Sequence, residues 1–335
     1  MKPHLTLLVL LSIVIFRLST VPTVSRGESV NVINASDKVF SLIRKKIYLD
    51  LQKFYPSPHV ELLTGTVLGL NALSNVPTFN DILRKSGTIH VVVVSGFNIV
   101  LLFNFVENLV GPIYKFRNYL FALIITFVYA VFTGFGYPVI RAWIMSALSF
   151  STKYLGLSAS QLHIVMLTGL VMLILSPQTL FELSFQLSFL AVVGLIVVGP
   201  VVSSHIEQFY SGKNSLLSDF STSLAAQCLV WPLLSYNFGT INIIAPFVNA
   251  LVLWTIPRIT VLGLVAVCLV PSVTLSYLLA FAIYPFLDFF VEVVTIFARI
   301  PFANIAFKIP LLALLVYYSS LFVLLAVYNR YYAEV

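Results

Sequence analysis

Residues 87–99 read GTIHVVVVSGFNI, an apolar stretch that carries four polar side chains. The four valines are stiff β-branched residues, and the Ser-Gly pair that follows them weakens the continuity of a helix. A break at Gly96 exposes backbone N–H and C=O groups that lipid cannot satisfy, so those groups must face protein or water. We therefore expect a helix that is broken at membrane depth, a device by which transporters and channels build polar sites.

The composition of the whole chain supports a membrane protein. Of its 335 residues, 59% are apolar and only 9% are charged, whereas soluble domains average roughly 25% charged residues. So few charged side chains do not cover the surface of a soluble protein of this size, while a bundle facing lipid needs almost none. The high apolar content also excludes a disordered chain. A disulfide scaffold is excluded because Cys228 and Cys268 lie singly in apolar runs. The sequence predicts an all-α, polytopic transmembrane helical bundle with an interfacial amphipathic helix and broken or re-entrant helices.

Proline, glycine and charged residues divide the chain into apolar stretches close to the roughly 20 residues that a spanning helix needs. The candidate spans are residues 88–110, 118–134, 138–156, 158–176, 179–202, 215–237, 241–270, 273–298 and 309–328. The very short turns at 134–138 and 176–177 predict that the helices on either side of each turn are antiparallel neighbours.

Three regions follow from this division. Residues 1–24 form an N-terminal anchor or signal-like helix, and an uncleaved anchor is favoured because no A-x-A-like site follows. Residues 25–87 form a basic segment, in which an amphipathic helix precedes a short re-entrant helix that carries Gly65-xxx-Gly69, a spacing that lets another helix approach closely. Residues 88–335 form the transmembrane domain. The distribution of Lys and Arg places residues 25–87 on the outer side of the membrane.

The basic segment presents an outer positive surface. Its members are Lys38, Lys45, Lys46, Lys53, Arg84 and Lys85. The first four project from a helix whose opposite, apolar face includes Phe40, Ile43 and Leu51. Such a helix binds anionic lipid headgroups or an incoming polyanion, and both interpretations stay open.

Ionisable and amide side chains inside spans are costly, so each one is a candidate for function. The predicted polar path comprises His90, Ser95, Gly96, Asn98, Arg141, Gln186 and Asn249. The alternative is structural: a helix cap for His90, bonds to neighbouring helices for Asn98, and snorkelling to the membrane interface for Arg141. The functional interpretation of Arg141 is a cation at a pore mouth that attracts phosphate.

Two carboxylates near the C-terminus need partners. Asp288 and Glu292 are four residues apart and share one helical face. They either hold a cation or proton or pair with Arg258 or Arg299, and pairing is the favoured interpretation.

Motifs for catalysis are missing from the sequence. It has no H-x-x-x-H or H-E-x-x-H metal spacing, no G-x-S-x-G elbow and no nucleotide-binding fingerprint, and its five histidines are scattered. We expect no enzymatic activity, no cofactor and no metal in this chain.

Several segments resemble those of one known family, the ComEC/Rec2 competence proteins. The family pattern G-x-x-H-x-x-x-x-S-G-x-H-I is similar to residues 87–99, its L-P-x-P segment to 55–69, its P-x-x-R-A element to 137–142, its S-F-x-L-S-F-x-A element to 183–191, and an Asn-bearing element to the region of Asn249. Each match is weak by itself. In this order and at these spacings, over about residues 55–260, the set is fairly specific.

The resemblance implies that single-stranded DNA crosses the bacterial cytoplasmic membrane during natural transformation, with residues 88–335 as a competence-type channel domain. The matching positions are His90, Ser95, Gly96, Arg141, Ser184, Ser188 and Asn249. The partners it implies are single-stranded DNA and separate nuclease and DNA-receptor proteins of the competence machinery. Anionic lipid and a second copy of the chain are further expected partners.

Two departures from the family pattern matter. Asn98 stands where the pattern has a second His, so a role that requires two imidazoles is in doubt. Larger members also carry an OB-like module and a metallo-β-lactamase-like module, and we expect neither in this chain. Strand degradation would then need another polypeptide. The alternative functions are a secondary transporter for a small anionic substrate and a membrane scaffold that does not transport.

Overall fold

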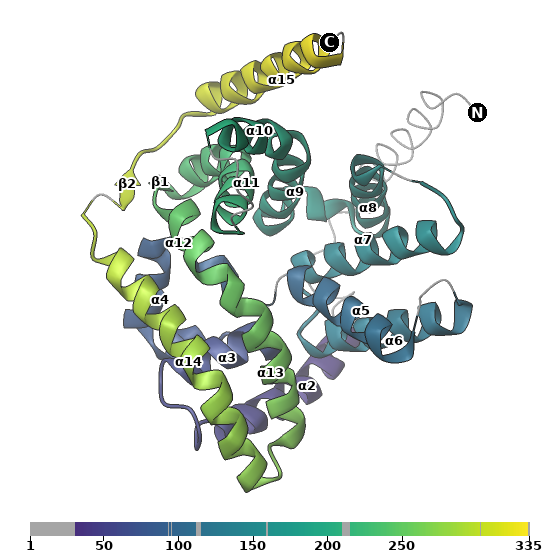
Figure 1. The fold of residues 1–335 in the computed structure, drawn as a ribbon, viewed down its shortest axis with the longest axis vertical. Coiled ribbons are helices and arrows are strands. Elements are labelled where there is room, and N and C mark those ends of the chain that lie inside the picture. The colour runs from purple at the N-terminus through teal and green to yellow at the C-terminus, as the bar shows by residue number, and fades with distance from the viewer. Residues whose placement is uncertain are drawn as a thin grey trace. The chain divides into compact units, whose positions relative to one another are not determined.

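The computed structural model describes residues 31–92, 94, 96–111, 115–158, 160–209, 215–301 and 303–333. Within these ranges the chain is almost entirely helical, with two strands of three residues each (Figure 1). The predicted all-α class is confirmed. The N-terminal anchor expected at residues 1–24 lies outside the described residues.

The elements follow the predicted order along the chain. They are α2 (Asn31–Leu51), α3 (His59–Leu68), η1 (Ala72–Asn75), α4 (Pro77–Ser86), η2 (Ile89–Val91), α5 (Gly96–Val110), α6 (Phe116–Phe132), α7 (Tyr137–Tyr154), α8 (Gln161–Leu175), η3 (Pro177–Phe181), α9 (Leu183–Val197), α10 (Gly199–Phe209), α11 (Ser215–Phe238), β1 (Thr240–Asn242), α12 (Ala245–Val252), η4 (Leu253–Thr255), α13 (Ile256–Leu269), α14 (Val273–Ala298), β2 (Asn304–Ala306) and α15 (Leu311–Ala333). Every predicted span from residue 88 onward contains a helix.

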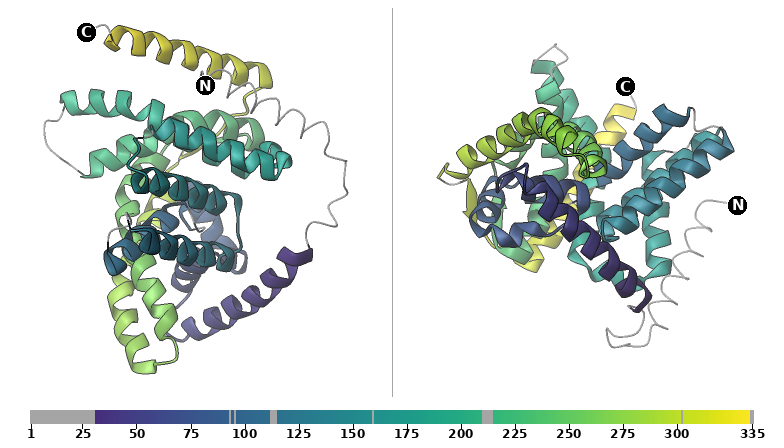
Figure 2. Two further views of the ribbon diagram at one scale, coloured as in Figure 1. Left: turned by 90° about the vertical axis from the view of Figure 1, so that its right-hand side faces the viewer. Right: turned by 90° about the horizontal axis from the view of Figure 1, so that it is seen from below.

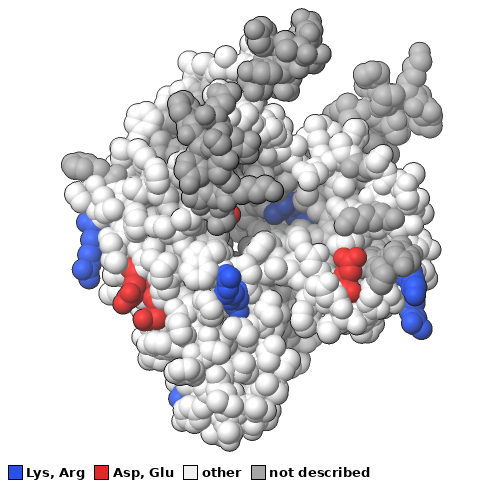
Figure 3. Space-filling model, in the orientation of Figure 1, with Lys and Arg blue, Asp and Glu red and all other residues white. Residues whose placement is uncertain are grey.

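Three stretches of the described chain are long and apolar enough to cross a membrane by length and composition. They are Ile89–Val110, Ala245–Leu269 and Val273–Ala298. Helices α9 and α10 bend by 47° at their junction and make a fourth span if they are counted as one. Charged side chains are scarce on the face shown in Figure 3, where they form small separate groups among uncharged residues. These features are those of a membrane protein.

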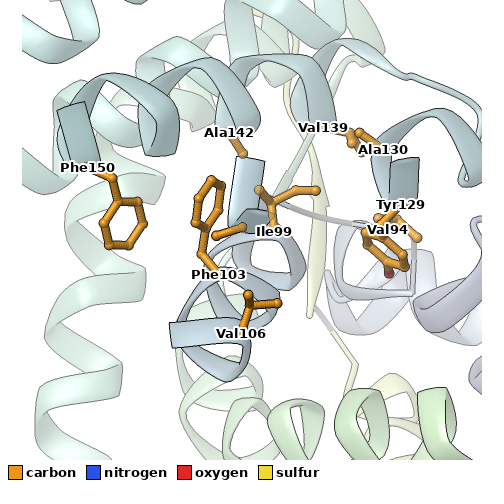
Figure 4. Packing of buried hydrophobic residues seen from close by; sticks show 10 residues of the cluster. Val94, Ile99, Phe103, Val106, Tyr129, Ala130, Val139, Ala142 and Phe150 are labelled. Atoms are coloured by element: carbon orange, nitrogen blue, oxygen red, sulfur yellow. The ribbon is translucent and has the colours of Figure 1, made fainter. Parts of the chain in front are cut away.

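The chain divides into two compact units. The first consists of Met1–Ala72, Val93–Gln186 and Thr260–Phe281, and the second of Leu73–Val92, Leu187–Ile259 and Ala282–Val335. The core of the first unit is formed by α5, α6 and α7 (Figure 4). Phe103 of α5 stacks on Phe150 of α7, with ring centroids 4.7 Å apart. Helices α6 and α7 are neighbours, as their short turn predicts.

Helix α3 is buried over its whole length of ten residues. Its neighbour α13 approaches closely at Gly263, where an added Cβ would lie 2.7 Å from Val67 and 2.8 Å from Leu63. Gly69 ends α3 in the left-handed conformation with φ of 68°, and an added Cβ there would lie 2.5 Å from the carbonyl oxygen of Thr133 at the end of α6. Gly69 thus admits the end of a second helix, as its spacing predicts.

Helix α2 (purple in Figure 2) is amphipathic as predicted. Phe40 packs edge-on against Phe132 of α6, and Arg44 and Leu51 are buried. Ile43, a member of the predicted apolar face, is 43% exposed, next to the exposed Leu42. The helix thus buries an arginine and exposes apolar side chains, which is the pattern of a helix with lipid on its outer face.

The second unit is built around α11, which contacts α10, α12 and α15. Tyr317 and Tyr318 of α15 donate hydrogen bonds to the carbonyl oxygens of Cys228 and Leu229, at 2.9 and 2.7 Å. Strands β1 and β2 pair antiparallel, with Thr240 opposite Ala306. The close contact between α9 and α11 depends on Gly194, where a Cβ would lie 2.6 Å from the carbonyl oxygen of Ala225.

We predict that Gly194→Ala lowers the free energy of unfolding of the detergent-solubilised protein by about 1–3 kcal/mol, because the backbone carbonyl that the new methyl meets cannot turn away. Thermal unfolding followed by circular dichroism measures the loss. The matched control is Gly199→Ala, where the nearest atom is a Leu195 methyl at 3.9 Å. Equal stability of the two variants would show that α9 and α11 do not approach as described.

Candidate functional site

The predicted break in the signature helix is present in the first unit. Helix α5 begins at Gly96, and a Cβ at this position would lie 2.9 Å from the Cβ of Ala142 and 3.3 Å from Nη2 of Arg141. No larger side chain fits there without displacing α7. This contact joins the start of α5, at residues 96–99, to residues 137–142, which the sequence analysis singled out separately.

The electrostatics of this contact favour an anion. The first-turn N–H groups of a helix lack partners within the helix and carry the positive end of its dipole. The half-buried guanidinium of Arg141 lies beside that end, and one of its nitrogens is 3.3 Å from the sulfur of Met145. Two positive groups side by side repel each other, and an anion placed next to both relieves the repulsion. Helix α5 and Arg141 together make a candidate phosphate site.

Asn98, two residues further along α5, is buried and bonded within the protein. Its Nδ2 donates to the carbonyl oxygen of Thr66 at 2.7 Å, and Thr260 of α13 lies within 3.5 Å of its Oδ1. The hydroxyl of Tyr129 donates to the next carbonyl of α3, that of Val67, at 3.0 Å. Because the last four carbonyls of a helix lack helical partners, these two side chains cap the buried end of α3. A contact between Asn98 and a substrate stays a prediction.

The second unit holds two more of the predicted residues. Asn249 of α12 is 3% exposed and donates to Oγ of Ser223 in α11 at 2.8 Å, while its own Oδ1 has no hydrogen-bond partner among the described residues. His90 lies on η2 with its side chain exposed. These residues belong to a unit that is described separately from Gly96 and Arg141, so the structure does not test whether they share one path.

Gln186 at the start of α9 donates to the carbonyl oxygen of Leu180 at 2.9 Å. This bond caps η3 from the neighbouring helix. Ser184 is exposed and Ser188 is half-buried. Ser95 lies outside the described residues.

The predicted basic surface is exposed wherever its side chains are described. Lys53 pairs with Asp50 at 2.7 Å, which lowers the pKa of the Asp50 carboxyl below its usual value, and Lys85 pairs with Asp81 at the same distance. The other exposed members are Lys45, Lys46 and Arg84, while the side chain of Lys38 lies outside the described residues. Exposed pairs of this kind contribute little to stability, so the residues remain available to an anionic partner.

A buried polar pair was missed by the sequence analysis. Tyr48 of α2 donates a hydrogen bond of 2.9 Å to Glu61 of α3, whose side chain is 2% exposed. The available signal was that Glu61 is the one charged residue between Lys53 and Asp81 in the sequence. A lone carboxylate in a buried apolar helix must have a partner close by.

The expected pairing of Arg258 with Asp288 or Glu292 is wrong in the described part of the chain. The guanidinium lies over the rings of Trp254 and Phe286, at 4.9 and 5.8 Å from their centroids, and donates to the carbonyl oxygen of Trp254 at 2.6 Å. Aromatic faces and a backbone carbonyl take the place of a carboxylate.

Comparison with known proteins now identifies the family. A family model described as competence protein matches residues 74–331, which is most of the chain. The chain belongs to this family. It is also 26% identical over 219 residues to ComE operon protein 3 of Bacillus subtilis (strain 168), an overlap of 64% of this chain and 27% of that relative. The chain therefore spans far less than the full length of the curated relative. No solved structure matches it.

The matched region contains the α5 break, Arg141 and Asn249, so the site described above lies within the competence family's own segment. Among the described residues, no group of three or more His, Cys, Asp and Glu side chains is placed to hold a metal ion. The family match indicates the membrane part of a competence protein and a role in DNA uptake.

We predict that Asn98→Ala lowers the free energy of unfolding by about 1–3 kcal/mol, because it leaves the Thr66 carbonyl buried without its donor. The measurement is the thermal midpoint in detergent. Asn104→Ala is the matched control, since Asn104 lies on the same helix with an exposed side chain. If both variants unfold at the wild-type midpoint, Asn98 does not cap α3.

Proposed function

We propose that this protein forms the channel through which single-stranded DNA crosses the bacterial cytoplasmic membrane in natural transformation. Its membership of the competence family and its apolar helices support the membrane and DNA-uptake parts of this proposal. The observation that carries the channel part is the position of Arg141 beside the N-terminus of α5.

A DNA strand presents one phosphate per nucleotide, and proteins bind it largely by neutralising those phosphates. A site made of a fixed guanidinium and a helix N-terminus holds one phosphate and lets it go without chemical change. Such a site suits transport, because passage of the strand requires each phosphate to bind and then leave. The same arrangement would also hold a small inorganic anion, which is the competing function.

The lysines of α2 supply a first contact on the proposed outer side. Lys45 and Lys46 are exposed beside apolar side chains such as Leu42 and Leu49. This combination supports a position of α2 on an anionic lipid surface, where its lysines would also raise the local concentration of an approaching polyanion. In this proposal, degradation of the complementary strand falls to another polypeptide.

We predict that Arg141→Gln lowers entry of labelled single-stranded DNA into the cytosol of a transformable host by about tenfold or more, since a charged hydrogen bond contributes about 1.5–3 kcal/mol. The host carries this chain as its sole copy. Arg141→Lys should retain part of the uptake, because the charge remains while the planar fork is lost. The control is Arg117→Gln, which removes an exposed charge from α6.

Wild-type DNA entry in Arg141→Gln cells, with the protein present in the membrane at its usual level, would contradict the proposal. Loss of radiolabelled phosphate uptake with unchanged DNA entry would instead support a transporter for a small anion.

A further inference from the structure

Arg258 lies at the centre of a candidate span. The stretch Ala245–Leu269 has 25 residues, and Arg258 is thirteen residues after its first and eleven before its last. At 1.5 Å per residue, about 16 Å of helix separates it from the nearer end. Arginines near helix ends extend their charged groups to the membrane interface by snorkelling. Arg258 lies too far from either end of the span to reach the interface in this way. It is the one charged residue of the stretch, and its side chain is exposed.

The contacts of Arg258 form an aromatic platform in the second unit. The guanidinium lies over Trp254 and Phe286, and Trp254 also packs against Phe289, with ring centroids 5.4 Å apart at 59°. Trp254 is 38% exposed and Phe289 is 37% exposed. The surface therefore presents one cation and the exposed parts of two rings side by side.

Lipid is a poor environment for this surface. An exposed guanidinium at mid-membrane depth is costly, and such residues face water or another polar molecule. Its bond to the Trp254 carbonyl uses one nitrogen, Nη1, of a group that has five N–H donors. The remaining donors suit an anion as the ligand. The neighbouring rings suit a flat apolar group attached to that anion.

We propose that Trp254, Arg258 and Phe289 form a nucleotide-binding platform, in which a base of single-stranded DNA stacks on the exposed rings while its phosphate binds Arg258. The chemistry is that of proteins that hold single strands without reading their sequence, by stacking bases on aromatic faces beside a positive groove. This inference rests on the proposed function, since it names a second point at which the same strand is held.

The test uses the full-length chain in nanodiscs of neutral phosphatidylcholine, which removes anionic lipid as a competitor. The chain has three tryptophans, and Trp143→Phe with Trp231→Phe leaves Trp254 as the single fluorophore. A thymidine oligonucleotide should quench Trp254 fluorescence on binding. An abasic oligonucleotide of equal length and charge should bind about tenfold more weakly and quench little.

Variants separate the two halves of the platform. Trp254→Leu, followed with a labelled oligonucleotide, should remove the advantage of the thymidine strand over the abasic strand. Arg258→Gln should lower the affinity for both oligonucleotides about tenfold. Arg258→Lys should retain much of that affinity because it keeps the charge. Arg299→Gln is the control, since it removes an exposed charge from the region just after α14. Thermal midpoints identify any variant that has lost its fold. If Arg258→Gln is such a variant, the DNA affinity of Arg258→Lys tests the role of Arg258 instead.

Equal affinity for the two strands in the wild-type chain, or unchanged affinity in Arg258→Gln, would overturn the platform. A change in oligomeric state in Arg258→Gln without a change in affinity would also overturn it and assign this surface to a second copy of the chain. These failures leave the channel intact as long as DNA entry still depends on Arg141. If no strand binds and Arg141→Gln has no effect on entry, the proposed function itself fails.

Discussion

The structure depends on one constraint: a helix that ends inside the membrane must satisfy its last carbonyl groups with protein, because lipid offers no donor. Here the donors are side chains from elsewhere in the chain. Asn98 and Tyr129 supply them to the end of α3, and Asn118 donates to Val110 at the end of α5, at 2.9 Å. Short helices become tolerable at depth once their ends are capped in this way.

The cap at Asn98 holds the start of α5 in place. Because Asn98 bonds the first turn of α5 to α3, the N–H groups of that turn, which lack partners within the helix, keep a defined position beside α7. Gly96 then allows Arg141 to approach, because a side chain at this position would occupy the space. Asn98 on α5 and Arg141 on α7 thus lie at the same break, and in the proposed channel the first fixes the helix end while the second supplies the cation.

The sequence predicted the helices and the break because their signals are local. Glycine, proline and charged residues mark helix ends wherever they occur, so the break before Gly96 and the α6–α7 turn were found in the right places. A bond from Asn98 to a neighbouring helix was one of the two interpretations, but the partners of the caps were not predicted, because Asn98 and Thr66 are 32 residues apart and Tyr129 and Val67 are 62 apart. The burial of Arg44 in α2 was not predicted for a related reason. Arg44 is buried beside Gly134, a contact that depends on the α6–α7 turn and not on the periodicity of α2.

The central claim is that the first turn of α5 lines the route of the strand. The most direct measurement is photo-crosslinking in living cells during uptake of labelled DNA, with a photoreactive phenylalanine analogue at Phe97, which is 46% exposed and follows Gly96. The same analogue at Phe121 of α6, which is 47% exposed, serves as the comparison. If the first turn of α5 lines the route of the strand, we expect crosslinks to single-stranded DNA at position 97 and not at position 121. Equal crosslinking at both positions, or none at position 97 while DNA still enters, would contradict it.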